Sequence, residues 1–494
     1  MIDGSTTLGR RLARYRAATR PPPASLARIG VDDLAARLAE AVDGEVVHGP
    51  EGVIVRRDTP SRPLPVDRRR LAALPGQPPP DVPLICLDTE TTGLATAAGT
   101  MAFLIGLGWW ESDSFRQVQL LLPDHAEERA LLSALEAAIP PSAWLVTYNG
   151  RGFDWPLLTT RFRMARRSAP IHAGHLDLLP TVRRLFRHRM ADARLRTAEA
   201  ELLGLHRVGD VDGWEIPGRY LRFLAGAPAT ELAEVVRHND QDVRSLGRLM
   251  AYLETRLGDP AVRAEAPAGD LAGLGRAFAR ERRLREALDC LEAAIDRPVA
   301  SPPAPSAPSW RSEPATRPDR SVWSRRGPTT GPPPEEPWWS PRRPADYGGR
   351  PGRPVELGPP RTAQFDAPWT AERILAERAH LLRRVGRHRD AVEAWSGLMG
   401  GPGRIAVVAA IEVSKLREHR LRDRPGSLVA ALHGLDTIER RRRLGRPEPT
   451  LEADLHRRVR RLRHRLALES RVRPGTLTRR GAVSVGVEAA RPDL

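Results

Sequence analysis

The stretch PLICLDTETTGL, residues 83–94, decides the fold prediction for this chain. Leu84 to Leu87 is a short apolar run, typical of a buried central strand, and it ends in Asp88-Thr89-Glu90. Because positions i and i+2 of a strand point to the same side, both carboxylates should project together from the strand's C-terminal end. Open α/β sheets place their functional sites at that end.

Segments further along the chain complete an α/β pattern. Residues 103–110 and 115–122 are predicted to be two more strands, and a helix follows at 126–139. Residues 144–158 predict a fourth strand, a Gly-rich turn and the start of a helix, and the last helix is expected at 230–257. Asp154 stands where the helix after the Gly-rich turn begins. In the last helix, His238 and Asp242 are four residues apart and therefore share one face.

Three motifs in this order resemble those of the DEDD 3′→5′ exonuclease superfamily, and more closely its YprB-type ribonuclease-H-like domain. They are Asp-x-Glu after the first strand, Asn-Gly-x-x-Phe-Asp before a helix, and His-x-x-x-Asp in a late helix. The resemblance covers about residues 81–257 and implies an α/β fold, a ribonuclease-H-like mixed sheet flanked by helices. Further matching stretches are HLDLL (175–179), AEAELLGLHRVGD (198–210) and VVRHNDQDVRSL (235–246).

The resemblance also implies a metal site. Converging carboxylates repel one another unless cations neutralise them, and oxygen-only ligands favour hard ions such as Mg²⁺ or Mn²⁺. Two such ions about 4 Å apart assist phosphodiester hydrolysis in many nucleases. By resemblance, the metal ligands are Asp88, Glu90, Asp154 and Asp242. His238 stands where the family has a side chain that orients or deprotonates the attacking water.

Several of these residues have alternative roles. A histidine base in this superfamily usually precedes the final aspartate by five residues and a tyrosine by four, whereas His238 precedes Asp242 by four. His238 could therefore contact substrate or simply pack. Asp154 could cap its helix. Asn149 and Phe153 could hold the terminal nucleotide, with turn-forming and core roles as the alternatives.

Composition indicates a polyanionic partner and excludes several classes of protein. Lys and Arg outnumber Asp and Glu by 78 to 61, a net charge of +17, and most of the excess lies in residues 258–494. Two cysteines, Cys86 and Cys290, exclude a disulfide framework and a Cys-based zinc site. With no apolar run long enough for a signal peptide or a membrane span, the sequence predicts a soluble, cytoplasmic protein that does not bind membranes.

The rest of the chain predicts a separate all-α helical-repeat region. Leu274, Gly275, Phe278, Ala287 and Leu291 fall at the offsets of a tetratricopeptide-like (TPR) hairpin, and a poorer match follows at 379–398. We expect a partly disordered N-terminal extension (1–80), the ribonuclease-H-like domain (81–257) and a helical hairpin (258–296). A Pro-rich disordered linker (297–368), a helical-repeat region (369–471) and a flexible tail (472–494) should follow.

These observations predict a metal-dependent nuclease that acts on DNA or RNA, a 3′→5′ exonuclease, with helical repeats that bind substrate or a protein partner. The alternative is a non-catalytic nucleic-acid-binding scaffold with the same fold. The densest basic stretches, 440–443 and 457–465, are either nucleic-acid contacts or solvated helix faces. Four retained carboxylates favour the enzyme, because a scaffold gains nothing from charges that repel one another.

Overall fold

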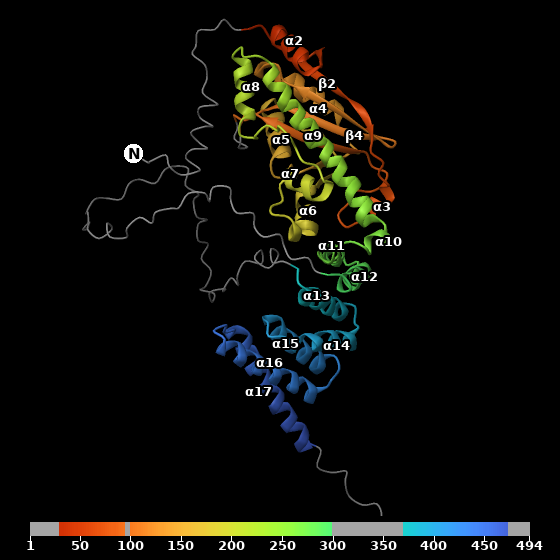
Figure 1. The fold of residues 1–494 in the computed structure, drawn as a ribbon, viewed down its shortest axis with the longest axis vertical. Coiled ribbons are helices and arrows are strands. Elements are labelled where there is room, and N and C mark those ends of the chain that lie inside the picture. The colour runs from red at the N-terminus through yellow and green to blue at the C-terminus, as the bar shows by residue number, and fades with distance from the viewer. Residues whose placement is uncertain (1–28, 94–98, 299–368, 473–494) are drawn as a thin grey trace, which may run out of the picture. The chain divides into compact units, whose positions relative to one another are not determined.

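The structure, a computed structural model, describes residues 29–93, 99–298 and 369–472 (Figure 1). The predicted Pro-rich linker and the C-terminal tail therefore fall almost entirely outside the described residues, as does the start of the N-terminal extension. The assignments of disorder to these segments stay predictions.

One seven-stranded mixed sheet forms the centre of the N-terminal part, in the order β1-β2-β5-β4-β3-β6-β7. The strands are β1 Glu45–Gly49, β2 Gly52–Pro63, β3 Leu84–Thr91, β4 Ala102–Glu111, β5 Ser114–Leu121, β6 Trp144–Thr147 and β7 Gly174–Asp177. Strands β1, β2, β5, β4 and β3 pair antiparallel, while β6 and β7 run parallel to β3. This arrangement confirms the predicted mixed sheet and the four strands expected around Asp88.

Two strands of the sheet come from the segment expected to be an extension. In the hairpin β1–β2, Val55 lies opposite Leu121, so β2 continues the sheet beyond β5. Most β1 and β2 side chains outside Val53–Val55 are partly or fully exposed, which is why the hydrophobic pattern there was too weak to predict strands. Helix α2 (Val31–Val42) packs on β2.

Helices flank the sheet, as predicted. They are α3 Arg68–Ala72, α4 Glu128–Ala138, α5 Asp154–Met164, α6 Leu178–Phe186, α7 Leu195–Ala198, α8 Ile216–Leu224, α9 Thr230–Leu253 and α10 Pro260–Arg263, with short 3₁₀ or π turns η1 His125–Glu127, η2 Arg187–Arg189, η3 Glu199–Leu203 and η4 Glu254–Gly258. Strand β3 is buried on both faces: Ile85 and Leu87 belong to one apolar cluster, Leu84 and Cys86 to another. The continuous apolar run of β3 follows from this double burial.

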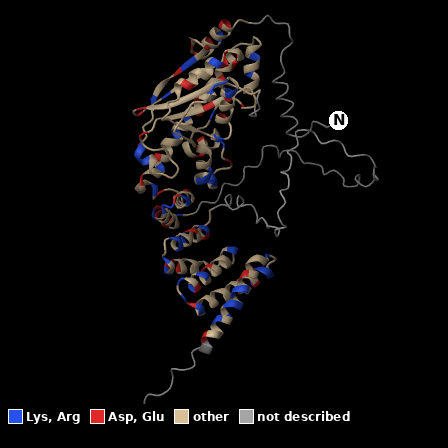
Figure 2. Cartoon of the chain, turned by 180° about the vertical axis from the view of Figure 1, so that it is seen from behind, with Lys and Arg blue, Asp and Glu red and all other residues tan. Residues whose placement is uncertain are grey.

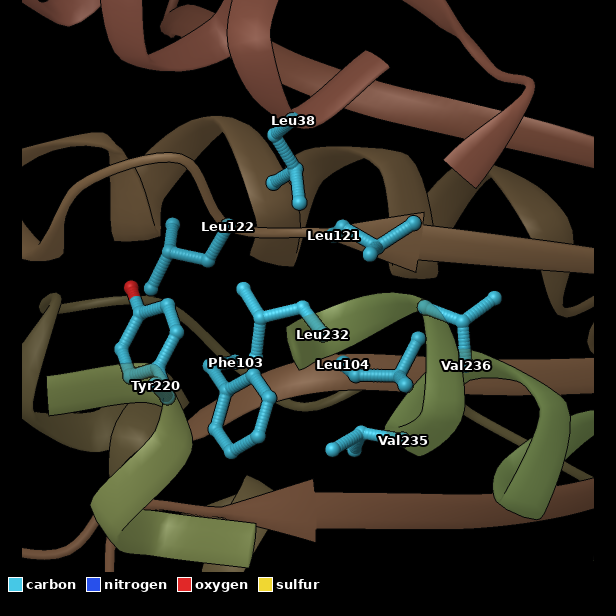
Figure 3. Close-up of a pocket in the computed structure, with 9 residues that line it drawn as sticks. All are labelled: Leu38, Phe103, Leu104, Leu121, Leu122, Tyr220, Leu232, Val235 and Val236. Carbon is cyan, nitrogen blue, oxygen red and sulfur yellow. The ribbon is translucent and has the colours of Figure 1, made fainter. Parts of the chain in front are cut away.

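Figure 3 shows where α2, α8 and α9 meet strands β4 and β5. Leu38 of α2, Phe103 of β4 and Tyr220 of α8 pack there with leucines and valines, and the rings of Phe103 and Tyr220 stack with centroids 4.2 Å apart. The gap between these side chains is too small for a water molecule, so this is packed core rather than a ligand cavity. Helix α2 is therefore part of the same core as the predicted domain.

Helix α9 passes very close to strand β4. A Cβ added at Gly106 would lie 2.2 Å from Asn239 Oδ1, and one at Gly108 would lie 2.8 Å from Val243 Cγ1. Only glycine fits under the helix at these two positions. The close approach brings the middle of α9 over Asp88, which lies opposite Gly106 in the sheet.

The remaining described residues form helices, each packed against the next along the chain. These are α11 Ala268–Arg280, α12 Leu284–Ile295, α13 Ala371–Arg384, α14 His388–Leu398, α15 Arg404–His419, α16 Arg424–Arg443 and α17 Pro449–Val472. They confirm a helical region after the sheet domain, although nothing specific to tetratricopeptide repeats is established. Gly386 lies at the turn between α13 and α14 and has a left-handed φ of +84°.

The hairpin α11–α12 contacts neighbours on both sides. Toward the sheet domain, a Cβ at Gly273 would lie 2.7 Å from the carbonyl oxygen of Arg184 in α6, so the two helices touch closely. On the other side, Arg378 of α13 forms an ion pair with Glu292 of α12 at 3.3 Å. The hairpin therefore packs on the sheet domain and on the later helices at the same time.

Much of the positive charge in the last helices is neutralised within the chain. In Figure 2, Lys and Arg are interspersed with Asp and Glu along these helices. Glu418 of α15, with a side chain only 1% exposed, accepts hydrogen bonds from Arg458, Arg461 and Arg465 of α17. We call this group the Glu418 cluster. None of the described helices is long and apolar enough to cross a membrane.

Candidate active site

The C-terminal end of β3 carries the first two carboxylates. Asp88 and Glu90 project to one side of the strand, and a bulge follows directly after Glu90. Asn239 of α9 donates from Nδ2 to Asp88 Oδ2 at 2.9 Å, which holds that carboxylate in place. This contact depends on the close approach of α9 to β4.

Asp154 joins this pair from the start of α5. It is 6% exposed, and its Oδ1 accepts a hydrogen bond from the Thr89 hydroxyl at 2.5 Å. The N-cap of α5 is Phe153 and no side chain caps the helix, so Asp154 does not fill the N-cap role considered as its alternative. Thr89 lies between Asp88 and Glu90 and therefore ties the second motif to the first.

The turn before α5 presents Asn149 and Phe153. Asn149 is exposed, has a left-handed φ of +70°, and donates its backbone N–H to Asp177 Oδ1 at 2.8 Å. Asp177 also accepts from the backbone N–H of Arg151 at 3.3 Å, so this buried carboxylate braces the whole turn. Phe153 is half-buried. Neither residue has a side-chain hydrogen bond to the carboxylates among the described residues.

Helix α9 brings His238 and Asp242 to the same place. His238 Nε2 lies 3.6 Å from Asp242 Oδ2 and 3.9 Å from Glu90 Oε1. The four-residue spacing thus directs the imidazole toward the carboxylates, even though it matches neither spacing usual in the superfamily. Asp88, Glu90, Asp154 and Asp242, which we call the carboxylate cluster, come together with His238.

An arginine that the sequence did not single out lies beside this cluster. The guanidinium of Arg207, 3% exposed, forms ion pairs with Glu199 at 2.6 Å, with Asp210 at 3.1 Å and with Asp242. The stretch 198–210 was noticed only as a match to the family, and nothing in its pattern marks Arg207 as an inward-facing cation. Asn239 was missed for a similar reason, because it stands among six consecutive polar residues, 237–242.

Electrostatic strain marks the carboxylate cluster. Burial raises the pKa of Asp88 and of Glu90 well above the usual range, and the neighbouring charges of Asp242 and Asp154 raise both further. Burial also raises the pKa of Asp154, to about 6, despite the hydrogen bond from Thr89. For Asp242, burial raises the pKa, and His238 and Arg207 offset part of that effect. Perturbed pKa values of this kind gather at functional sites.

The donor set of the cluster suits a hard divalent cation. It consists of carboxylate oxygens whose repulsion such an ion would relieve. Asn239 donates to one oxygen of Asp88, and the Thr89 hydroxyl donates to one oxygen of Asp154, so both carboxylates are held in place. As the side chains stand, no three His, Cys, Asp or Glu residues in the described parts of the chain are close enough to hold a metal ion. The chemistry of the donor set nevertheless fits such an ion.

Comparison with known proteins supports the assignment of a ribonuclease-H-like fold to the sheet domain. A family model of the ribonuclease H superfamily matches residues 85–254, which contain the whole carboxylate cluster. The chain is 38% identical over 176 residues to the uncharacterized protein YprB of Bacillus subtilis (strain 168). The match covers 35% of this chain and 42% of the length of that protein. The resemblance to a YprB-type ribonuclease-H-like domain is thereby confirmed for this region.

Proposed function

We propose that this chain is a metal-dependent nuclease that hydrolyses phosphodiester bonds in DNA or RNA as a 3′→5′ exonuclease. The observation that carries the proposal is the convergence of four carboxylates, Asp88, Glu90, Asp154 and Asp242, from β3, α5 and α9. The raised pKa values of Asp88, Glu90 and Asp154 reflect burial and mutual repulsion, and a bound cation would relieve that repulsion. A scaffold would gain stability by replacing such residues, because buried like charges are costly.

The carboxylate cluster would hold two Mg²⁺ or Mn²⁺ ions. Bound divalent ions make water a better nucleophile and stabilise the negative charge that develops on the leaving oxygen. The protein's own contribution is to fix the ligands: Asn239 orients Asp88, Thr89 orients Asp154, and Arg207 orients Asp242.

We assign His238 the role of general base or water-orienting group. Its Nε2 faces Glu90 and Asp242 at 3.9 and 3.6 Å, so it lies at the edge of the cluster without itself being one of the carboxylate ligands. A positioned base typically contributes about 10²–10⁴-fold to the rate. Substituting His238 by alanine should therefore slow turnover by about 10²-fold or more while Mn²⁺ binding persists.

Substrate would reach the site past the turn at residues 149–153. The exposed amide of Asn149 and the half-buried ring of Phe153 flank Asp154, where they could hydrogen-bond and stack on a terminal nucleotide. The helical region 369–471 would supply weaker backbone contacts or bind a protein partner.

The test is cleavage by the purified full chain. Single- and double-stranded DNA and RNA, labelled at either end, are incubated with Mn²⁺, Mg²⁺ or EDTA. We expect cleavage only with a divalent ion, and mononucleotide release from the 3′ end. Asp212→Asn is the matched control for variants of the site, because Asp212 is exposed and its side chain accepts a hydrogen bond only from Trp214 among the described residues. Binding without cleavage in every condition would instead support the scaffold.

A further inference from the structure

The imidazole of His238 is held from behind by a residue outside the carboxylate cluster. Asp210 Oδ1 lies 2.6 Å from His238 Nδ1, the ring nitrogen that faces away from Glu90 and Asp242. The side chains of Asp210 and His238 are only 13% and 15% exposed. A short hydrogen bond at this depth restricts the rotation of the ring.

Asp210 is itself held by two further donors. Its Oδ1 also accepts the backbone N–H of Val211 at 3.0 Å, and its Oδ2 accepts from Arg207 at 3.1 Å. Arg207 is anchored in turn by Glu199, whose side chain is fully buried and accepts from the Ser245 hydroxyl at 2.5 Å. Both oxygens of Asp210 are thus engaged, so Asp210 is not a further metal ligand.

The direction of the bond between Asp210 and His238 follows from the protonation of the carboxyl group. Arg207 donates to Asp210 Oδ2 and the backbone N–H of Val211 donates to Oδ1, and these two contacts stabilise the ionised carboxylate. An ionised carboxylate can only accept, so His238 Nδ1 carries the hydrogen. The contact between Arg207 and Nδ1, at 3.3 Å, is longer and secondary. In the neutral ring, the lone pair is then on Nε2, toward Glu90 and Asp242.

We propose that Asp210 is a positioning residue: it fixes the orientation and tautomer of His238 so that Nε2 points at the carboxylate cluster, and Arg207 holds Asp210 for that task. The inference rests on the proposed nuclease function for its catalytic consequence, but not for the geometry of the ring. A carboxylate behind a catalytic histidine acts in this way in other hydrolases.

The experiment compares full-length Asp210→Asn, His238→Ala, the double variant and the control Asp212→Asn. Asparagine keeps the shape of the side chain but can donate to Nδ1, which favours the other tautomer. We expect Asp210→Asn to lower kcat by about 10²-fold with little change in KM, the scale of a lost general base. In the His238→Ala background it should cost nothing more. Mn²⁺ affinity by calorimetry should stay within a few-fold of the unmodified protein.

A readout without catalysis separates the two hypotheses. ¹⁵N NMR of the side chain, assigned by its loss in His238→Ala, should show Nδ1–H in the unmodified protein and a changed pattern in Asp210→Asn. If the unmodified protein cleaves nothing, the proposed function fails and the spectrum alone decides the positioning role. Unchanged His238 signals in Asp210→Asn would overturn that role.

Two kinetic results would also overturn it: cleavage by Asp210→Asn within a few-fold of the unmodified protein, or a further loss when the substitution is added to His238→Ala. Should Asp210→Asn fail to fold, Asp210→Ser provides the same comparison, because serine removes the carboxylate with a smaller side chain. The same outcomes apply to it.

Discussion

Two groups of buried charged side chains in this molecule have central residues of opposite charge. Beside the carboxylate cluster, one arginine, Arg207, is surrounded by Glu199, Asp210 and Asp242. In the Glu418 cluster, one glutamate is surrounded by three arginines of α17. Each centre is almost fully buried, with the Arg207 side chain 3% and the Glu418 side chain 1% exposed.

The difference lies in where the excess charge is placed. The excess arginines of the Glu418 cluster reach solvent, since the side chains of Arg461 and Arg465 are 44% and 48% exposed. The excess carboxylates near Arg207 do not, since Glu90 and Asp242 are only 12% and 15% exposed. Water can stabilise the first group, whereas in the proposed function a divalent cation would stabilise the second. The first is a structural group, and the second has the properties of a binding site.

The strongest challenge to this comparison is to remove a carboxylate from the site. Asp88→Asn should lose detectable metal-dependent cleavage and bind Mn²⁺ at least about 10²-fold more weakly, because one ligand charge is lost while the side-chain shape is kept. Without metal, the variant should be at least as thermally stable as the unmodified protein, because a buried like charge has gone. Calorimetry with unchanged Mn²⁺ affinity would contradict the assignment of Asp88 as a ligand.

Removing the carboxylate at the centre of the Glu418 cluster should instead destabilise the fold. Glu418→Gln leaves Arg458 buried without its anion, and breaking a buried pair costs roughly 3–5 kcal/mol. Urea denaturation of the full chain, followed by circular dichroism, should show this loss, with cleavage kept under native conditions. The control is Glu439→Gln, whose pair with Arg442 is exposed and should contribute less than about 1 kcal/mol. Equal stability of the two variants would remove the distinction between the groups.

A pH series sharpens the comparison. The pKa of Asp154 is about 6 in the folded protein and 3.8 in its unperturbed state, so the folded state binds this proton more tightly. Its contribution to stability therefore falls as pH rises from 3.8 to 6 and stays low above that range. In EDTA, the stability gained by Asp154→Asn should be about 1 kcal/mol larger at pH 7.5 than at pH 5.

Thermal unfolding at the two pH values measures this difference. Saturating Mn²⁺ should abolish it, because the metal stabilises the ionised carboxylate, and Asp212→Asn should show none. A difference of the opposite sign would mean that Asp154 is already neutralised within the protein.

The smallest effect is expected on the surface of α17. Arg460 and Arg463 are exposed and form no ion pair among the described residues. If they contact phosphates, replacing both by alanine should weaken binding to single-stranded nucleic acid a few-fold and reduce the salt slope by about 1.4. Filter binding at several salt concentrations measures both quantities. Arg116→Ala, on the exposed end of β5, is the control, and an unchanged slope would leave α17 as a solvated face.

The sequence predicts those parts of the fold and site whose pattern is local. The apolar run at residues 84–87 and the spacing of His238 and Asp242 led directly to β3 and to one face of α9. Strands β1 and β2 were not predicted, because most of their side chains are partly or fully exposed. In addition, β2 joins the sheet by pairing with β5, a partner more than fifty residues away. Arg207 and Asp210 were missed for a comparable reason: an inward-facing loop residue has no periodicity, and only the fold brings it to His238.

The hairpin α11–α12 has a consequence for how this chain unfolds. One continuous apolar cluster includes Leu185 of α6, Phe278 of α11, Leu291 of α12 and Leu382 of α13. Cooperativity follows shared burial, so heat or denaturant should melt the sheet domain and helices α11 to α13 in one transition rather than in succession. A destabilising substitution in the hairpin would then lower the folded fraction of the sheet domain as well. A truncation after residue 257 would expose the apolar surface that the hairpin covers, and the shortened protein should aggregate.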